Sequence, residues 1–148
     1  MATSSSGLIV VGADGSDLSI GALRWAARQA EYTGSEIVVV TGFYVPITIF
    51  IVPTYTDEDY ARDAQVMLDH TIEKAFESRP PNVRVRATLV EEKPAMALTG
   101  LSKNADLLVV GSHGQGELPG MHLGSVSSYC VHHASCPVLV YRGEHTGR

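Results

Sequence analysis

Glycine is concentrated in one stretch of the chain, from Gly111 to Ser125. Five of these fifteen residues are glycine, at positions 111, 114, 116, 120 and 124. Glycine has no Cβ, so such a backbone can bring amide groups close to a phosphate, and a helix that begins near Ser125 would add unpaired N–H groups and its positive dipole end. The stretch is typical of an anion-binding loop, and ordinary turn chemistry is the alternative reading.

Two familiar phosphate-binding motifs are excluded. A P-loop requires a Gly-Lys pair, and the chain contains none. A dinucleotide fingerprint of the form G-x-G-x-x-G should follow the first strand, where this chain has Gly12-Ala-Asp-Gly15. A phosphate loop of a different kind is therefore expected.

The elements that would position this loop alternate regularly. Continuous apolar runs indicate strands that are covered on both faces, and apolar residues at helical spacing lie between them. Val83–Leu89 instead alternates apolar and polar residues, which predicts an edge strand. The predicted strands are 8–12, 36–41, 83–89, 106–111 and 137–141, and the predicted helices start at Ser16, Asp57, Pro94 and Ser125. Five strands alternating with four helices predict a three-layer α/β fold with a parallel sheet and right-handed crossovers.

Asp14 follows the first predicted strand, next to the same edge of the sheet. In open parallel sheets a ligand lies beyond the carboxyl ends of the strands, where the strand order reverses. Asp14 is therefore a candidate ligand contact. The alternative is an acidic residue that is favoured only by the helix dipole behind it.

Longer motifs on both sides of the loop resemble one family. Gly111-x2-Gly114-x9-Gly124-Ser125 is similar to the G-x2-G-x9-G-[ST] nucleotide motif of the universal stress protein family. Val10–Ser16 resembles the first strand and acidic turn of that family, and the segments 105–114, 124–127 and 132–138 resemble its C-terminal half. The resemblance extends from about Leu8 to Tyr141.

The resemblance implies a fold, a ligand and an assembly. The fold is a Rossmann-like (adenine nucleotide alpha hydrolase-like) one with sheet order 3-2-1-4-5, and the ligand is ATP, with Mg²⁺. Asp14 would face the ribose or a phosphate-bound metal, main-chain groups near Thr41 and Gly42 would recognise adenine, and the glycine loop would hold the phosphates. A homodimer would form through Pro137–Tyr141. The expected contacts are Ala13, Asp14, Thr41, Gly42, Gly111, Ser112, His113, Gly114, Gly116, Gly124, Ser125, Val126 and Ser127.

The charges of the loop favour binding over catalysis. It contains Glu117 and no Lys or Arg, and only His113 and His122 could add positive charge. We therefore expect binding of modest strength through amide dipoles and a divalent cation, with no catalytic residue. The main hypothesis is a nucleotide-dependent regulatory homodimer in stress response, with unidentified protein partners. The alternatives are a slow ATPase or nucleotidyl-transfer enzyme, and a nucleotide-free dimeric interaction module.

Composition excludes other classes. The 148 residues fit one domain, expected at 8–142 between a flexible leader, 1–7, and a flexible tail, 143–148. Eleven scattered basic residues against sixteen acidic ones argue against nucleic-acid binding. The uncharged run Ile37–Thr56 is interrupted by Gly42, Pro46 and Pro53, so no membrane span is expected.

Two cysteines are too few for a disulfide framework, which predicts a reducing, cytoplasmic location. On one helix, Cys130 and His133 would lie on a different face from His132 and Cys136, so no metal site is expected and Cys130 is predicted to be a buried thiol. The apolar segment Tyr44–Tyr55 would either pack against its own sheet or cover the adenine or a partner surface.

Overall fold

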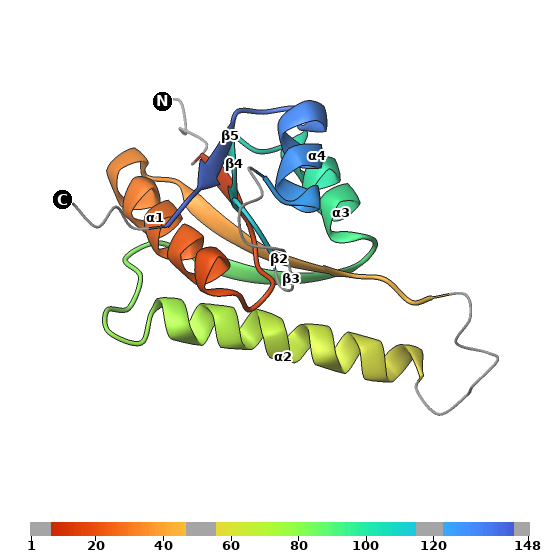
Figure 1. Ribbon diagram of the computed structural model, residues 1–148. Helices are drawn as coiled ribbons and strands as arrows, with labels where there is room; N and C mark the ends of the chain where they lie inside the picture. Colours follow the sequence, from red (N-terminus) through yellow and green to blue (C-terminus); the bar gives the residue numbers. More distant parts are fainter. Residues whose placement is uncertain (1–6, 47–55, 115–122, 144–148) are drawn as a thin grey trace, which may run out of the picture.

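The computed structural model describes residues 7–46, 56–114 and 123–143, and these residues form the predicted alternation of strands and helices. Figure 1 shows their arrangement. The elements are β1 (Leu8–Gly12), α1 (Asp17–Thr33), β2 (Glu36–Phe43), α2 (Asp57–Ala75), β3 (Val85–Glu91), α3 (Pro94–Ser102), β4 (Leu107–Gly111), α4 (Ser125–His133) and β5 (Val138–Tyr141).

The five strands form one parallel sheet of order β3-β2-β1-β4-β5, which confirms the predicted order and places β3 at an edge. β1 pairs with β2 through Gly12↔Val40 and with β4 through Val11↔Val109. The strand order reverses at β1, because the chain continues to β2 on one side and returns to β4 on the other. Ligands of open α/β sheets bind at such a reversal.

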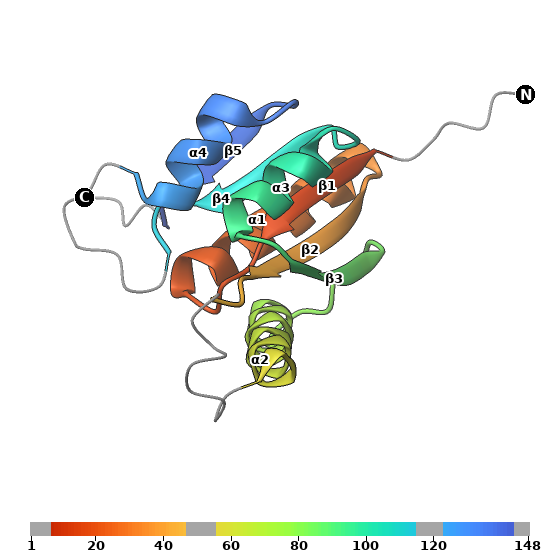
Figure 2. The ribbon, with the colours of Figure 1, turned by 90° about the vertical axis from the view of Figure 1, so that its right-hand side faces the viewer.

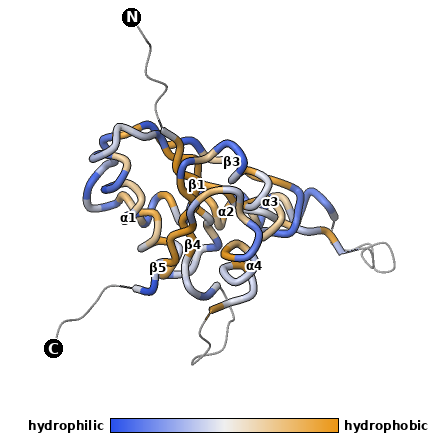
Figure 3. The backbone as a smooth tube through the Cα atoms, turned by 90° about the horizontal axis from the view of Figure 1, so that it is seen from above, coloured by the Kyte–Doolittle hydropathy of each residue, from blue (hydrophilic) through white to orange (hydrophobic). Residues whose placement is uncertain are grey.

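Helices cover both faces of the sheet, as Figure 2 shows: α1 and α2 lie on one face, and α3 and α4 lie on the other. Alternate residues of β1 serve the two cores, with Ile9 and Val11 packing under α1 and Val10 packing under α3. This double burial explains the continuous apolar runs in the sequence. In Figure 3 they appear as hydrophobic stretches along the central strands.

The helix ends follow local sequence signals. Ser16 caps α1 by accepting a hydrogen bond from the Ser19 amide, and Gly34 ends the helix in a left-handed conformation, both at the predicted positions. The Arg24 side chain, from α1, donates to the carbonyl oxygens of Ala75 and Lys74 at 3.1 and 2.9 Å. Arg24 thereby satisfies the last carbonyls of α2 and joins the two helices.

The uncharged run Ile37–Thr56 begins as the buried strand β2, and no helix among the described residues is long and apolar enough to cross a membrane. β2 continues beyond the predicted end at Thr41, because its pairing with β3 extends to Phe43↔Glu91. The Lys93 ammonium lies 5.3 Å from the centre of the Tyr44 ring. Residues 47–55 lie outside the described residues, so both interpretations of the apolar segment stay predictions.

At Gly42, β2 lies close to the turn that precedes α3. A Cβ at this position would lie 2.8 Å from Pro94 Cα and 2.9 Å from the Glu92 carbonyl oxygen, both backbone atoms. Gly42→Ala should therefore lower the free energy of unfolding by about 1–3 kcal/mol. The matched control is Gly100→Ala in α3, where a Cβ would have no neighbour within 4 Å. It should leave stability unchanged or raise it by up to about 1 kcal/mol. Urea unfolding measures both, and equal effects would contradict the close approach.

The Cys130 thiol is fully buried, as predicted from the sequence. Burial raises its pKa from 9.0 to about 11. Below pH 9 the thiol is protonated in both the folded and the unfolded chain, whereas above pH 9 it ionises first in the unfolded chain. The free energy of unfolding should therefore fall by roughly 2 kcal/mol between pH 9 and 11 on account of this group.

Urea unfolding at several pH values tests this effect, with Cys130→Ala as the comparison. The variant should lose stability less steeply above pH 9 than the wild type, although the cavity it leaves lowers its stability at every pH. Parallel pH profiles of the two proteins would contradict the effect.

Candidate functional site

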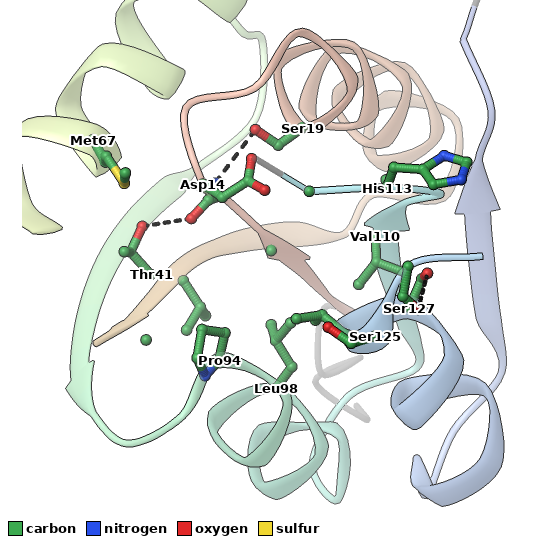
Figure 4. Close-up of a pocket in the computed structure, with 18 residues that line it drawn as sticks. Asp14, Ser19, Thr41, Met67, Pro94, Leu98, Val110, His113, Ser125 and Ser127 are labelled. Carbon is green, nitrogen blue, oxygen red and sulfur yellow. Dashed lines mark hydrogen bonds between the residues drawn. The ribbon is translucent and has the colours of Figure 1, made fainter. Parts of the chain in front are cut away.

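A cavity of about 360 Å³ opens where the strand order reverses. Figure 4 shows it between the carboxyl ends of β1, β2 and β4 and the first residues of α4. The segments Gly12–Asp14, Val40–Gly42 and Val110–Gly111 reach it because parallel strands end at the same edge of the sheet. The volume lies within the usual range for small-molecule sites.

One part of the cavity is apolar. Val40, Met67, Pro94 and Leu98 line it, and they come from β2, α2 and α3. Thr41 and Gly42, which follow Val40 in β2, also line the cavity. An apolar wall beside backbone donors and acceptors suits a flat aromatic base, because the base can be enclosed and also hydrogen-bonded at its edge.

The other part is built from glycine and the start of α4. Gly124 is the N-cap of α4 and offers no side chain to cap it, so the positive end of the helix dipole lies at the cavity wall, which Gly124 and Ser125 line. The Ser112 carbonyl oxygen accepts from the Gly124 amide at 2.7 Å and from Ser127 Oγ at 2.8 Å. These bonds bring the two ends of the glycine loop together. The geometry suits an anion.

Asp14 faces this part of the cavity from the end of β1. Its Oδ1 atom accepts hydrogen bonds from both the amide and the hydroxyl of Ser16. Its Oδ2 atom is directed at the glycine loop, because a Cβ on Gly114 would lie 2.8 Å from it. One carboxylate oxygen therefore binds the start of α1, and the other lies toward Gly114 at the cavity.

The described lining residues carry little charge. Asp14 is the carboxylate among them, and His113 is the residue that could carry a positive charge. The His113 ring lies 3.1 Å from Ser112 Oγ, measured from Nδ1. A Mg²⁺ ion usually takes one or two carboxylates together with phosphate oxygens and water. The single carboxylate beside an anion cradle fits this pattern.

The predicted contacts converge on the cavity, except for Ser112 and Gly116. Ser112 is buried and supplies its carbonyl to the loop instead of lining the cavity, and Gly116 lies outside the described residues. The Ser127 hydroxyl lines the cavity while donating to the carbonyls of Ser112 and Gly124, so its hydrogen is used within the loop. The lining residues are Ala13, Asp14, Thr41, Gly42, Gly111, His113, Gly114, Gly124, Ser125, Val126 and Ser127.

Sequence reasoning missed seven of the lining residues. They are Gly12, Ser19, Val40, Met67, Pro94, Leu98 and Val110. Gly12, Val40 and Val110 adjoin predicted contacts on the same strands and could have been included by strand position. No sequence pattern indicated Met67, Pro94 or Leu98. Their position at the cavity depends on how α2 and α3 pack against the sheet.

Comparisons with known proteins agree with this architecture. A universal stress protein of Mycobacterium tuberculosis is 35% identical over 134 residues, which cover 90% of this chain and 45% of that protein. The chain thus spans about half the length of the curated relatives that it matches. A solved universal stress protein in complex with cAMP has a TM-score of 0.66 at 26% identity, covering 94% of this chain and 98% of that one.

A universal stress protein from Archaeoglobus fulgidus, solved in complex with dAMP, has a TM-score of 0.69 at 19% identity. The match covers 95% of this chain and all of that one, and it shows the shared fold. The model of the universal stress protein family matches residues 7–142. The sheet order, the placement of the cavity and the match over nearly the whole chain lead to one conclusion: this chain belongs to the universal stress protein family.

Proposed function

We propose that this chain binds an adenine nucleotide, ATP with Mg²⁺, in the cavity beyond β1 and β4. The observation that carries the proposal is the division of the cavity into an apolar part beside the β2 main chain and a glycine-rich part at the start of α4. The first part suits the base, and the second suits phosphate. Asp14 would hold the cation together with the phosphate oxygens.

Relatives solved with cAMP and with dAMP support the choice of adenine. In this chain, Thr41 and Gly42 would present main-chain groups to the base, and Gly111, Gly114, Gly124 and Ser125 would surround the phosphates. The low positive charge among the described lining residues favours modest affinity, because amide dipoles and the cation would have to balance the phosphates.

Such a site fits regulation by binding. Phosphoryl transfer requires a positioned base and a cationic clamp on the transferred group. Among the described lining residues, His113 alone could supply positive charge. We therefore propose that bound nucleotide biases the pairing or conformation of a homodimer in stress response, and so its contacts with protein partners.

The homodimer would form through β5. This strand ends the sheet on one side, and its four residues are each half-buried.

Nucleotide binding is tested with Gly114→Ala. The added methyl group would lie 2.8 Å from Asp14 Oδ2 and displace the carboxylate, so affinity should fall at least about tenfold while the fold persists. Isothermal titration with ATP and Mg²⁺, AMP and cAMP measures the affinity. Gly100→Ala, which changes an open position on α3, is the control and should bind like the wild type. If the wild type binds none of the three nucleotides, the proposed function is wrong.

Dimer formation is tested with a proline at the free edge of β5. The carbonyls of Pro137 and Tyr141 accept from the β4 side, at Leu108 N and Ser112 N. In a parallel ladder this places the Leu139 amide toward β4 and the Val140 amide toward the free edge. Val140→Pro should therefore give a folded monomer, because proline removes the donor that a second copy would use and leaves the donors toward β4 in place, although it also loses some packing of Val140 against the core.

Leu139→Pro is the matched comparison, and it should destabilise the fold itself because it removes a donor to β4. Light scattering after size exclusion measures the mass of each variant, and circular dichroism its fold. A Val140→Pro protein that stays dimeric would move the interface away from β5.

A further inference from the structure

The turn after β1 is held by hydroxyl groups from three other elements. Consecutive main-chain groups of Ala13, Asp14 and Gly15 each pair with one of them. Thr41 Oγ1 donates to the Ala13 carbonyl at 2.8 Å, the Asp14 amide donates to Ser19 Oγ at 3.4 Å, and the Gly15 amide donates to Thr71 Oγ1 at 3.1 Å. The turn that presents Asp14 is thus tied to β2, α1 and α2.

Thr71 differs from the other two hydroxyl residues because it does not line the cavity. Thr41 and Ser19 are wall residues, whereas Thr71 lies on α2 and is 0% exposed. Its hydroxyl donates to the Met67 carbonyl at 2.9 Å, so its one hydrogen is used within the helix. The oxygen is then oriented as an acceptor for Gly15, 56 residues away in sequence.

The position of Thr71 on α2 makes a polar residue unexpected. The other buried residues of this helix are Ala64, Leu68 and Ala75, which with Thr71 form one stripe at helical spacing against the body of the protein. Packing alone would favour an apolar side chain there, and threonine is a weak helix former. The hydrogen bond to Gly15 explains why a residue with a hydroxyl group occupies this position of the stripe.

The Gly15 bond matters because the turn is conformationally demanding. Gly15 has φ 83°, a left-handed conformation that favours glycine. Glycine also gives the backbone of the turn more conformational freedom than another residue would. The Gly15 amide belongs to the peptide group that follows the Asp14 Cα. The Ala13 carbonyl, to which Thr41 donates, belongs to the peptide group that precedes it. Fixing both sides sets the direction of the Asp14 side chain.

We propose that Thr71 is a positioning residue for the nucleotide site, which holds the Asp14 carboxylate toward the glycine loop through the Gly15 amide. This inference rests on the proposed nucleotide binding. It also assigns α2 a role in the site beyond the wall contact of Met67, because the same hydroxyl bonds both Met67 and the turn.

The test compares two substitutions of Thr71. Thr71→Val keeps the shape of the side chain and leaves the part-buried Gly15 amide without its acceptor, whereas Thr71→Ser keeps the hydroxyl and loses a methyl group. Affinity for AMP, and for ATP with Mg²⁺, is measured by isothermal titration on variants that circular dichroism shows to be folded. Thr71→Val should bind about tenfold more weakly, and Thr71→Ser should bind within about twofold of the wild type.

A second control separates positioning from loss of stability. Leu68→Val removes a methylene group from the same buried stripe, one turn away from Thr71, at a residue that is not among those lining the cavity. It should lower the melting temperature and leave the affinity within about twofold. Wild-type affinity in Thr71→Val would overturn the inference, as would an equal loss of affinity in Leu68→Val. A wild type that binds neither probe would instead overturn the proposed function, and this inference with it.

Discussion

The parallel pairing of β1 with β2 on one side and β4 on the other is the constraint on which the rest of the structure depends. Because the three strands run in the same direction, they end at one edge, and the residues that follow them meet there. The pairing itself is held by burial on both faces, with Val11 at 0% exposure on one side and Val10 at 1% on the other. The cavity is therefore a consequence of how the core packs.

Main-chain groups of glycine residues contribute to the wall of the site. Gly111, Gly114, Gly124 and the start of α4 border the cavity, and hydroxyl side chains hold the nearby backbone in place: Ser127 bonds the Ser112 carbonyl, and Thr41 bonds the turn after β1. Amide dipoles fixed in this way need no rearrangement to meet an anion. The chain has a formal charge of −5, which repels an anion. Such local dipoles offset this repulsion at the site.

Much of the fold could be predicted because its signals are local. Doubly buried strands produce continuous apolar runs, the alternation in 83–89 marked the edge strand β3, and Ser16 and Gly34 marked the ends of α1. The strand order came from family resemblance, and the pairing confirms it. The predicted contacts at the strand ends and in the loop came largely from the family resemblance, and most of them line the cavity.

The remaining features depend on packing between distant elements, which single-sequence patterns do not encode. Thr71 lies 56 residues from the amide it accepts, and its spacing on α2 indicated only a core position. Met67 and Leu98 reach the cavity because of the angles at which α2 and α3 cross the sheet. Ser112 was expected to contact the ligand, but it is buried and supports the loop through its carbonyl. Glycine spacing alone could not distinguish a residue that lines the cavity from one that lies behind its wall.

The most direct test of the central claim is a titration of the ¹⁵N-labelled protein with ATP and Mg²⁺, followed by amide chemical shifts. Nucleotide binding at the strand reversal predicts that the largest changes fall on Ala13, Gly42, Gly111, Gly114 and Ser125, which border the cavity from β1, β2, β4 and α4. A spectrum that stays unchanged at saturating nucleotide, or changes that gather away from these strand ends, would contradict the account.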